Sequence, residues 1–295
     1  MNFFDVIDVP FDNPILYIIG PTAIGKSDLA LSLAQKHGAE IISADSYQVY
    51  QGMDIGTAKV SKEDQQKVPH HLIDTHTPDQ SYSVMDFIHY CNKQIKANKP
   101  MIICGGNGLF LRSFLYQYNF PKAESDPQVR ESLMMAYAQD KDALWNQLNA
   151  IDPDSASKIH VNNVHQLVRA LEIYTITKKA PSQIKHQHPS PREDVTIVGL
   201  TCDRNVVIDR INARVDAMVS NGLIEEAQGL LSAGYSPTLP ALKCIGYQEA
   251  FEYIHGRISL DEMIELLKIH TRQFSKRQMT WFKKIDNVFW NILYK

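Results

Sequence analysis

The stretch GPTAIGKS at residues 20–27 decides the fold of this 295-residue chain. It matches the pattern GxxxxGK[ST] and lies between the apolar run ILYIIG (15–20) and SDLALSLAQKHG (27–38), whose apolar residues have helical spacing. A strand, a glycine-rich turn and a helix in this order predict a P-loop, whose backbone N–H groups surround a phosphate. A turn that needed only glycine would not require the lysine and serine. The expected phosphate-binding residues are Gly20, Pro21, Thr22, Ala23, Ile24, Gly25, Lys26 and Ser27, and the Ser27 hydroxyl is the expected ligand for Mg²⁺.

Further strands are predicted by the short apolar runs EIISA (40–44), MIIC (101–104) and TIVGL (196–200). Strands separated by helices are typical of a parallel sheet covered on both faces. Three helical patterns follow one another between Pro121 and Val195, namely PQVRESLMMAYAQ, DALWNQLNAI and NVHQLVRALEIYTITKK, and PSQIKHQHPSPRED then predicts a loop. After Thr201 come the helical patterns VIDRINARVDAMV, LIEEAQGLL with Gly234 as its cap, and the long segment from Leu260 to Phe282.

We therefore expect an α/β fold, with a P-loop NTPase-like parallel sheet flanked by helices and an all-helical insertion domain. The expected core is discontinuous and comprises residues 1–121 and 196–295, and the insertion comprises residues 122–195.

Asp45 directly follows the run EIISA. The carboxyl ends of parallel strands meet at one edge of the sheet, so this carboxylate is expected to face the P-loop. The alternative is that Asp45 only caps a following helix or turn.

The composition is that of an ordinary globular chain, with 44% hydrophobic and 21% charged residues. No apolar run approaches the ~18 residues that span a bilayer, and the first residues lack the basic and apolar segments of a secretion signal. The four cysteines form no CxxC pair, which argues against a zinc knuckle and a disulfide framework. We expect a cytoplasmic protein without a membrane partner.

The net charge is −3, but the segment from Leu266 to Lys284 contains basic residues and no acid. Such a local stripe can bind phosphates even when the whole chain is mildly acidic, although a solvated helix face explains it equally well. Its basic residues are Lys268, Arg272, Lys276, Arg277, Lys283 and Lys284.

Two further patterns favour structural roles. His70 and His71 are adjacent, so they point in different directions, and no third metal ligand is spaced nearby. Leu267, Phe274 and Trp281 recur every seven residues, which predicts a helix face packed in the core.

Seven motifs occur in the order GPTAIGKSDLA, ISADSYQVYQGMDIGTAK, PHHLID, GGNGLFL, IHVNNVHQLVRALE, IGYQEA and TRQFSKRQMTWF. Together they resemble the bacterial tRNA dimethylallyltransferases, also called the IPP transferase family. The resemblance runs from about Ile15 to Trp290, nearly the whole chain.

The resemblance implies dimethylallyl diphosphate as co-substrate and adenosine 37 in the tRNA anticodon stem-loop as acceptor. It implies that Asp45 is the general base, that Lys26, Ser27 and Arg214 bind the diphosphate, and that Asn107 is a catalytic residue. The implied tRNA contacts are Asp45, Ser46, Tyr47, Gln48, Arg130, Gln166, Leu167, Val168, Arg169, Ala170, Lys243, Cys244, Ile245, Gly246, Tyr247, Gln248, Arg272, Lys276 and Arg277. A flipped adenine could stack on Tyr47, Tyr50, Trp281 or Phe282, each of which could equally be a core residue. We expect a monomer.

Two departures from the family pattern stand out. Asn107 replaces a threonine, and Val161, Asn163 and Gln166 stand where proline, aspartate and arginine are common. Three alternatives stay open at this point: a P-loop kinase for a small molecule or nucleoside, an isopentenyltransferase acting on free AMP, and an RNA-binding protein with an inactive P-loop.

Overall fold

The computed structural model describes residues 13–97, 99–118, 126–184 and 190–293. Within them, a six-stranded sheet has the strand order β3-β2-β4-β1-β5-β6, and every neighbouring pair is parallel. The strands are β1 (Ile15–Ile19), β2 (Glu40–Ser43), β3 (His70–His71), β4 (Met101–Cys104), β5 (Val195–Thr201) and β6 (Val288–Ile292). The four predicted strands and the expected α/β fold are confirmed, whereas β3 and β6, the two edge strands, were not predicted.

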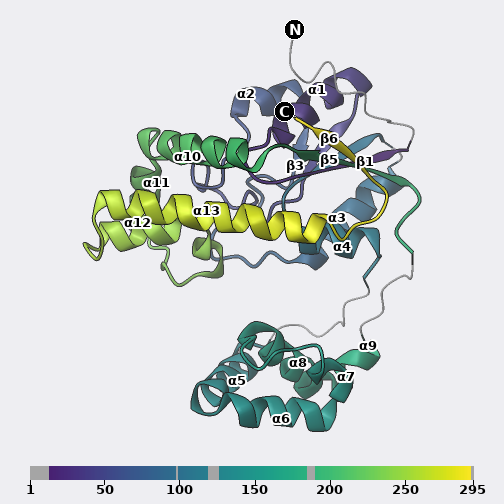
Figure 1. Cartoon of the computed structure of the whole chain (residues 1–295), viewed down its shortest axis with the longest axis vertical. Helices are drawn as coiled ribbons and strands as arrows, with labels where there is room; N and C mark the ends of the chain where they lie inside the picture. Colours follow the sequence, from purple (N-terminus) through teal and green to yellow (C-terminus); the bar gives the residue numbers. More distant parts are fainter. Residues whose placement is uncertain (1–12, 98, 119–125, 185–189, 294–295) are drawn as a thin grey trace. The chain divides into compact units, whose positions relative to one another are not determined.

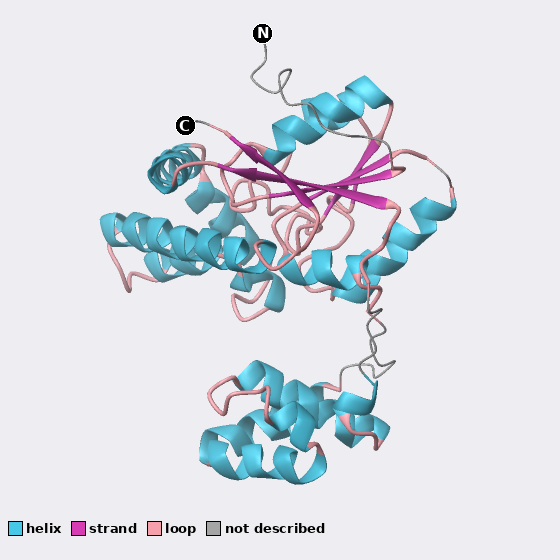
Figure 2. Cartoon of the chain, turned by 45° about the vertical axis from the view of Figure 1, so that its right-hand side comes forward, coloured by secondary structure: helices cyan, strands magenta, loops and turns pink. Residues whose placement is uncertain are grey.

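Helices cover both faces of this sheet (Figures 1 and 2). The helices before and after the insertion are α1 (Lys26–His37), α2 (Lys62–Lys67), α3 (Val84–Lys96), α4 (Gly108–Leu115), α10 (Arg204–Ser220), α11 (Leu223–Ser232), the 3₁₀ helix η2 (Pro240–Lys243), α12 (Tyr247–Ile254) and α13 (Leu260–Phe282). The predicted helices are present, but α2, α3, α4, η2 and α12 were not predicted. Among the described residues, no helix is long and apolar enough to cross a membrane.

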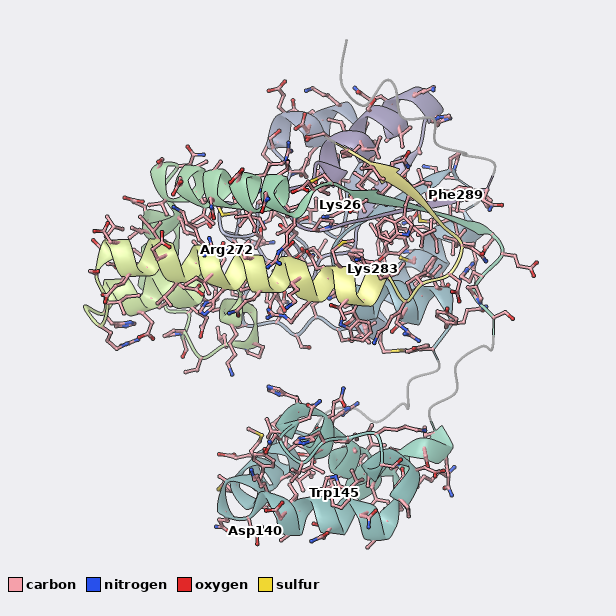
Figure 3. All side chains as sticks on the ribbon, viewed as in Figure 1. Lys26, Asp140, Trp145, Arg272, Lys283 and Phe289 are labelled. Atoms are coloured by element: carbon pink, nitrogen blue, oxygen red, sulfur yellow. The ribbon has the colours of Figure 1, made fainter. Side chains whose placement is uncertain are left out.

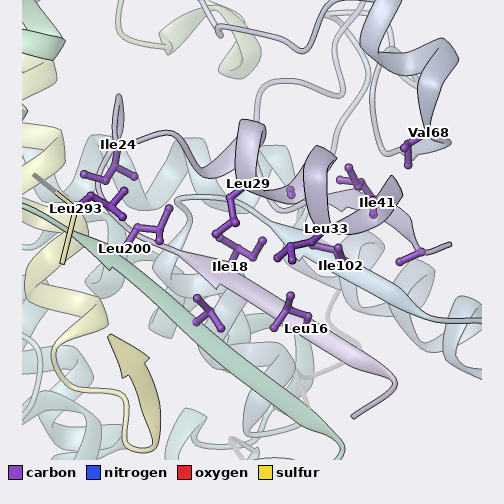
Figure 4. Close-up of a cluster of buried hydrophobic side chains, with 14 residues drawn as sticks. Leu16, Ile18, Ile24, Leu29, Leu33, Ile41, Val68, Ile102, Leu200 and Leu293 are labelled. Atoms are coloured by element: carbon purple, nitrogen blue, oxygen red, sulfur yellow. The ribbon is translucent and has the colours of Figure 1, made fainter. Parts of the chain in front are cut away.

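The first strand is the centre of the core. All five residues of β1 are buried, and β1 pairs with β4 on one side and β5 on the other. The helix face predicted for α1 packs on this sheet, with Leu29 and Leu33 lying against Leu16 and Ile18 (Figure 4). This packing fixes where α1 begins, directly after the glycine-rich turn.

The chain divides into two compact units, Met1–Arg112 with Arg192–Lys295, and Ser113–Pro191. The second unit contains α5 (Pro127–Gln139), α6 (Lys141–Ile151), α7 (Pro153–Ala156), α8 (Val164–Thr177) and α9 (Pro181–Ile184). The boundaries expected from the sequence, after residues 121 and 195, lie somewhat later in the chain than those of this unit. The loop predicted over PSQIKHQHPSPRED begins instead with the single turn α9, and residues 185–189 lie outside the described residues.

The adjacent histidines have structural roles. The His70 ring lies 2.7 Å from the Val68 carbonyl, and the His71 ring contacts Glu40 and Tyr90 at 2.8 Å each. Within the described residues, no three His, Cys, Asp or Glu side chains are grouped to hold a metal ion.

Gly105, which follows β4, packs tightly against the backbone that leads to Asp45. A Cβ atom at this position would lie 2.2 Å from the Ala44 carbonyl oxygen. We therefore expect Gly105→Ala to destabilise the chain by about 1–3 kcal/mol, because the backbone itself must move. A matched change, Gly229→Ala in α11, meets no atom within 4 Å and should be neutral or stabilising by up to ~1 kcal/mol. Thermal unfolding of both variants checks this, and equal melting temperatures would contradict the close contact.

Candidate functional site

The glycine-rich turn is built as a phosphate cradle. Gly25 has φ 102° and ends the turn, so that α1 begins at Lys26. As at any helix start, the first N–H groups of α1 have no partner within the helix and carry a partial positive charge, which suits an anion. The Lys26 ammonium donates to the carbonyls of Gly20 at 3.0 Å and Pro21 at 2.8 Å. Burial lowers the pKa of Lys26 to about 8.

Asp45 combines a structural and an available oxygen. Its Oδ1 accepts hydrogen bonds from the backbone N–H groups of Tyr47 at 2.8 Å and Gln48 at 3.4 Å, so the capping alternative is correct for this atom. Within the described residues, Oδ2 has no hydrogen-bond partner. Burial raises the pKa of Asp45, while the two backbone donors and the charge of Lys26 oppose that shift.

A cleft of about 390 Å³ brings many predicted site residues together. They come from five separate stretches of the core unit, and they are Thr22, Asp45, Tyr47, Arg214, Lys243, Cys244, Ile245 and Arg277. Arg214 also reaches the P-loop, since its Nη1 lies 3.4 Å from the Thr22 Oγ1. Figure 3 marks Lys26 in this unit, together with Arg272 on α13 and Lys283 directly after that helix. The cleft therefore places a base and cations beside the phosphate cradle.

Glu226, which the sequence analysis did not identify, orders one wall of the cleft. Its carboxylate accepts from the backbone N–H groups of residues 54–56, at 2.8–3.0 Å, and from the Tyr247 hydroxyl at 2.6 Å. Tyr247 and Gly246 are buried, so this side of the predicted contact segment supports the site from behind. Lys243 and Gln248 are exposed. Glu226 lies in the acidic first turn of α11, which is the signal that could have pointed to it. The loop that it binds, however, lies about 170 residues earlier in the sequence.

Asn107 uses its side-chain oxygen within its own loop. Its Oδ1 accepts from the backbone N–H groups of Leu109 at 3.0 Å and Phe110 at 3.2 Å, which caps α4. Threonine is also a good N-cap residue, so the departure from the family pattern keeps the same local role.

The face of α13 that contains Leu267, Phe274 and Trp281 was predicted to pack in the core, but most of it is exposed to solvent. Leu267 is buried, but Phe274 is 36% and Trp281 44% exposed, so that prediction is wrong for two of the three residues. Phe274 lines the cleft, and the Arg277 guanidinium lies 5.9 Å from its ring centroid. Of the other predicted aromatic contacts, Tyr50 and Phe282 are core residues.

The basic residues of α13 differ in their surroundings. Lys276 and Arg277 are exposed, whereas Arg272 donates to Asn212 at 2.8 Å and Lys268 pairs with Asp216. Ser46 and Gln48 are partly buried, and the Gln48 amide is held by the Thr57 carbonyl.

The predicted contacts in the helical unit surround a buried carboxylate. Arg130 and Arg169 each donate to Glu172 at 2.8 Å, which lowers the pKa of Glu172 against the opposing effect of its burial. The side chains of Leu167, Val168 and Ala170 belong to the core of this unit, whereas Gln166 is exposed. Among the predicted tRNA contacts of this unit, the side chains of Gln166, Arg130 and Arg169 are therefore the ones that reach its surface.

The P-loop yields a binding prediction. Lys26→Ala should weaken the binding of inorganic diphosphate by about 1.5–3 kcal/mol, because a charge-assisted contact is lost. The cation is present below the pKa of about 8, so the advantage of the wild type over the variant should shrink as the pH rises beyond that value. Calorimetry between pH 6.5 and 9.5 measures it, with the exposed Lys36→Ala on the same helix as control. A constant advantage over the whole range would contradict this role of Lys26.

Comparisons with known proteins agree on one family. The family model described as IPP transferase matches residues 48–285. A tRNA dimethylallyltransferase of Acetivibrio thermocellus is 44% identical over 285 residues, covering 94% of this chain and 90% of the relative. That of Geobacillus thermodenitrificans is 44% identical over 283 residues, covering 94% and 89%.

Solved structures are similar as well. The tRNA isopentenylpyrophosphate transferase of Bacillus halodurans has a TM-score of 0.69 and 38% identity, and covers 95% of this chain and 90% of its own. A eukaryotic dimethylallyltransferase acting on tRNA has a TM-score of 0.80 and 27% identity, with coverage of 94% and 73%. Because the family model spans well over half of the sequence and the relatives match nearly all of it, this chain belongs to the IPP transferase family.

Proposed function

We infer that this chain transfers a dimethylallyl group from dimethylallyl diphosphate to N6 of adenosine 37 in tRNA and releases diphosphate. Membership of the family and the names of its relatives support this function. The observation that carries it is the cleft, in which Thr22 and Arg214 on the phosphate side meet Asp45, with Arg277 and Phe274 on a further wall.

The chemistry needs a stabilised leaving group more than a strong nucleophile. The carbon that is attacked is allylic, so its bond to diphosphate loosens early, and the adenine amine is weak because its lone pair is delocalised. Lys26, Arg214 and the helix start would stabilise the departing charge by fixed electrostatics. Asp45, with Oδ1 held by two backbone donors, would accept the amine proton on Oδ2.

The acceptor base would have to leave its stack to reach this carboxylate. Tyr47 and Phe274, which line the cleft, offer aromatic surfaces, and Arg277 adds a cation beside them. RNA loops are gripped through such stacking together with phosphate contacts. We propose contacts to the anticodon stem-loop from Lys243, Gln248, Lys276 and Arg277 in the core unit, and from Gln166, Arg130 and Arg169 in the helical unit.

Magnesium is proposed as a cofactor that binds together with the donor. Mg²⁺ in phosphate sites is typically held by one or two protein oxygens and by the substrate phosphates. Ser27, exposed at the start of α1, fits as the protein ligand, and the ion would share the charge of the diphosphate. We also propose that the chain acts as a monomer in the cytoplasm, where its tRNA substrate is found.

One assay separates this function from its alternatives. Labelled dimethylallyl diphosphate is offered with tRNA, with AMP or with neither acceptor. Label in tRNA alone is expected. Label in AMP would favour an adenylate isopentenyltransferase, and label in neither would favour the P-loop kinase or the RNA-binding protein.

Asp45→Asn tests the base. An asparagine oxygen can keep the two backbone hydrogen bonds, whereas the proton acceptor is lost. We expect the single-turnover rate to fall about 10²–10⁴-fold with tRNA affinity changed far less. If affinity fell as much as rate, Asp45 would be a binding residue.

The basic residues of α13 yield a salt-dependence prediction. Removing the charges of Lys276 and Arg277 together should weaken tRNA binding and reduce the slope of log K against log salt by up to about two. The double variant Lys93→Ala/Lys96→Ala in the last turn of α3 makes the same charge change beside the opposite edge of the sheet. An equal effect of both double variants would assign Lys276 and Arg277 to the solvated surface.

A further inference from the structure

Gln278 is a buried polar residue of α13, only 4% exposed, whose amide joins two loops. Its Oε1 accepts a hydrogen bond from the Thr22 backbone N–H at 2.8 Å, and its Nε2 donates to the Gly106 carbonyl at 3.1 Å. The uncharged amide of glutamine has a hydrogen-bond acceptor and a donor on the same carbon, so it can bond to two backbone groups at once.

The first of these loops belongs to the diphosphate side. Thr22 lies within the P-loop, and its hydroxyl is the group that Arg214 contacts at 3.4 Å. With its N–H directed to Gln278, Thr22 has a fixed orientation. Gln278 therefore holds the first turn of the cradle and, through Thr22, the arginine beside it.

The second loop contains Gly105 and Gly106 and packs behind Asp45, the proposed general base. Gly106 has no room for a side chain, since a Cβ atom would lie 2.0 Å from the Gln278 Nε2. The preceding Gly105 packs on the Ala44 backbone, and the Ala44 N–H donates to the Cys104 carbonyl at 2.8 Å. Ala44 is the residue before Asp45, so this turn supports the base from behind.

We propose that Gln278 is a positioning residue that sets the distance between the diphosphate cradle and Asp45, an inference that rests on the proposed transfer reaction. The same helix presents Phe274 and Arg277 to the cleft. One turn of α13 thus joins the acceptor wall to the P-loop and to the turn that packs behind Asp45.

Gln278→Glu and Gln278→Leu, two residues of similar size, test the proposal. A buried carboxylate can accept from Thr22 but faces the Gly106 carbonyl without a proton, so its transfer rate at pH 8 should be about tenfold to a hundredfold lower. Burial raises the pKa of a carboxyl group, and the protonated acid regains a donor for Gly106. The rate of Gln278→Glu relative to the wild type at the same pH should therefore recover as the pH falls. Gln278→Leu lacks both groups and should show no recovery.

The measurements are single-turnover rates with saturating tRNA and donor between pH 5.5 and 8.5, tRNA affinity, and the affinity for inorganic diphosphate. Tight tRNA binding is expected in both variants, with weaker diphosphate binding in Gln278→Leu. Gln228→Glu, on the exposed face of α11, is the matched control and should behave like the wild type.

Three results would overturn the positioning role: wild-type rates in Gln278→Glu at every pH, a loss that is equal and independent of pH in both variants, or unchanged diphosphate binding in Gln278→Leu. An inactive wild type would instead refute the proposed function, and the diphosphate measurement would still decide the role of Gln278.

Discussion

The parallel pairing of the central strands is the constraint on which the site depends. Because β2, β4, β1 and β5 run in one direction, the segments that follow them meet at one edge of the sheet. Residues 20–25 follow β1, Asp45 follows β2, and Gly105 and Gly106 follow β4. All five residues of β1 are buried, and the cradle directly follows this strand.

The pattern of the sequence was sufficient where chemistry and local geometry coincide. The P-loop, the four inner strands and the face of α1 could be predicted because apolar runs and glycine spacing report on burial and turns. The strand β3 has two residues, and β6 exposes Phe289 and Ile292 at the sheet edge, so neither has the pattern of a buried strand. The seven-residue spacing of Leu267, Phe274 and Trp281 likewise could not distinguish a helix face packed in the core from one that lines a cleft.

The residues that organise the site were hidden for a different reason. Glu226 and Gln278 act on backbone groups of loops about 170 and 256 residues away, and only the assembled tertiary structure brings them there. Asn107, for which the family motif implies catalysis, caps α4 through its Oδ1, and its catalytic role stays a prediction. The family resemblance located the site, whereas the hydrogen bonds distinguish residues that face the cleft from those that support it.

The contacts of Lys26 have a consequence for selectivity. Two of the three N–H donors of its ammonium already bond to carbonyls of its own loop, so an incoming anion meets one remaining donor and a charge that the carbonyl dipoles partly offset. A weakly charged anion gains little beyond that single contact. A ligand with several negative charges gains the most, so the loop should discriminate against chloride and single phosphates in the cell and remain available to its donor.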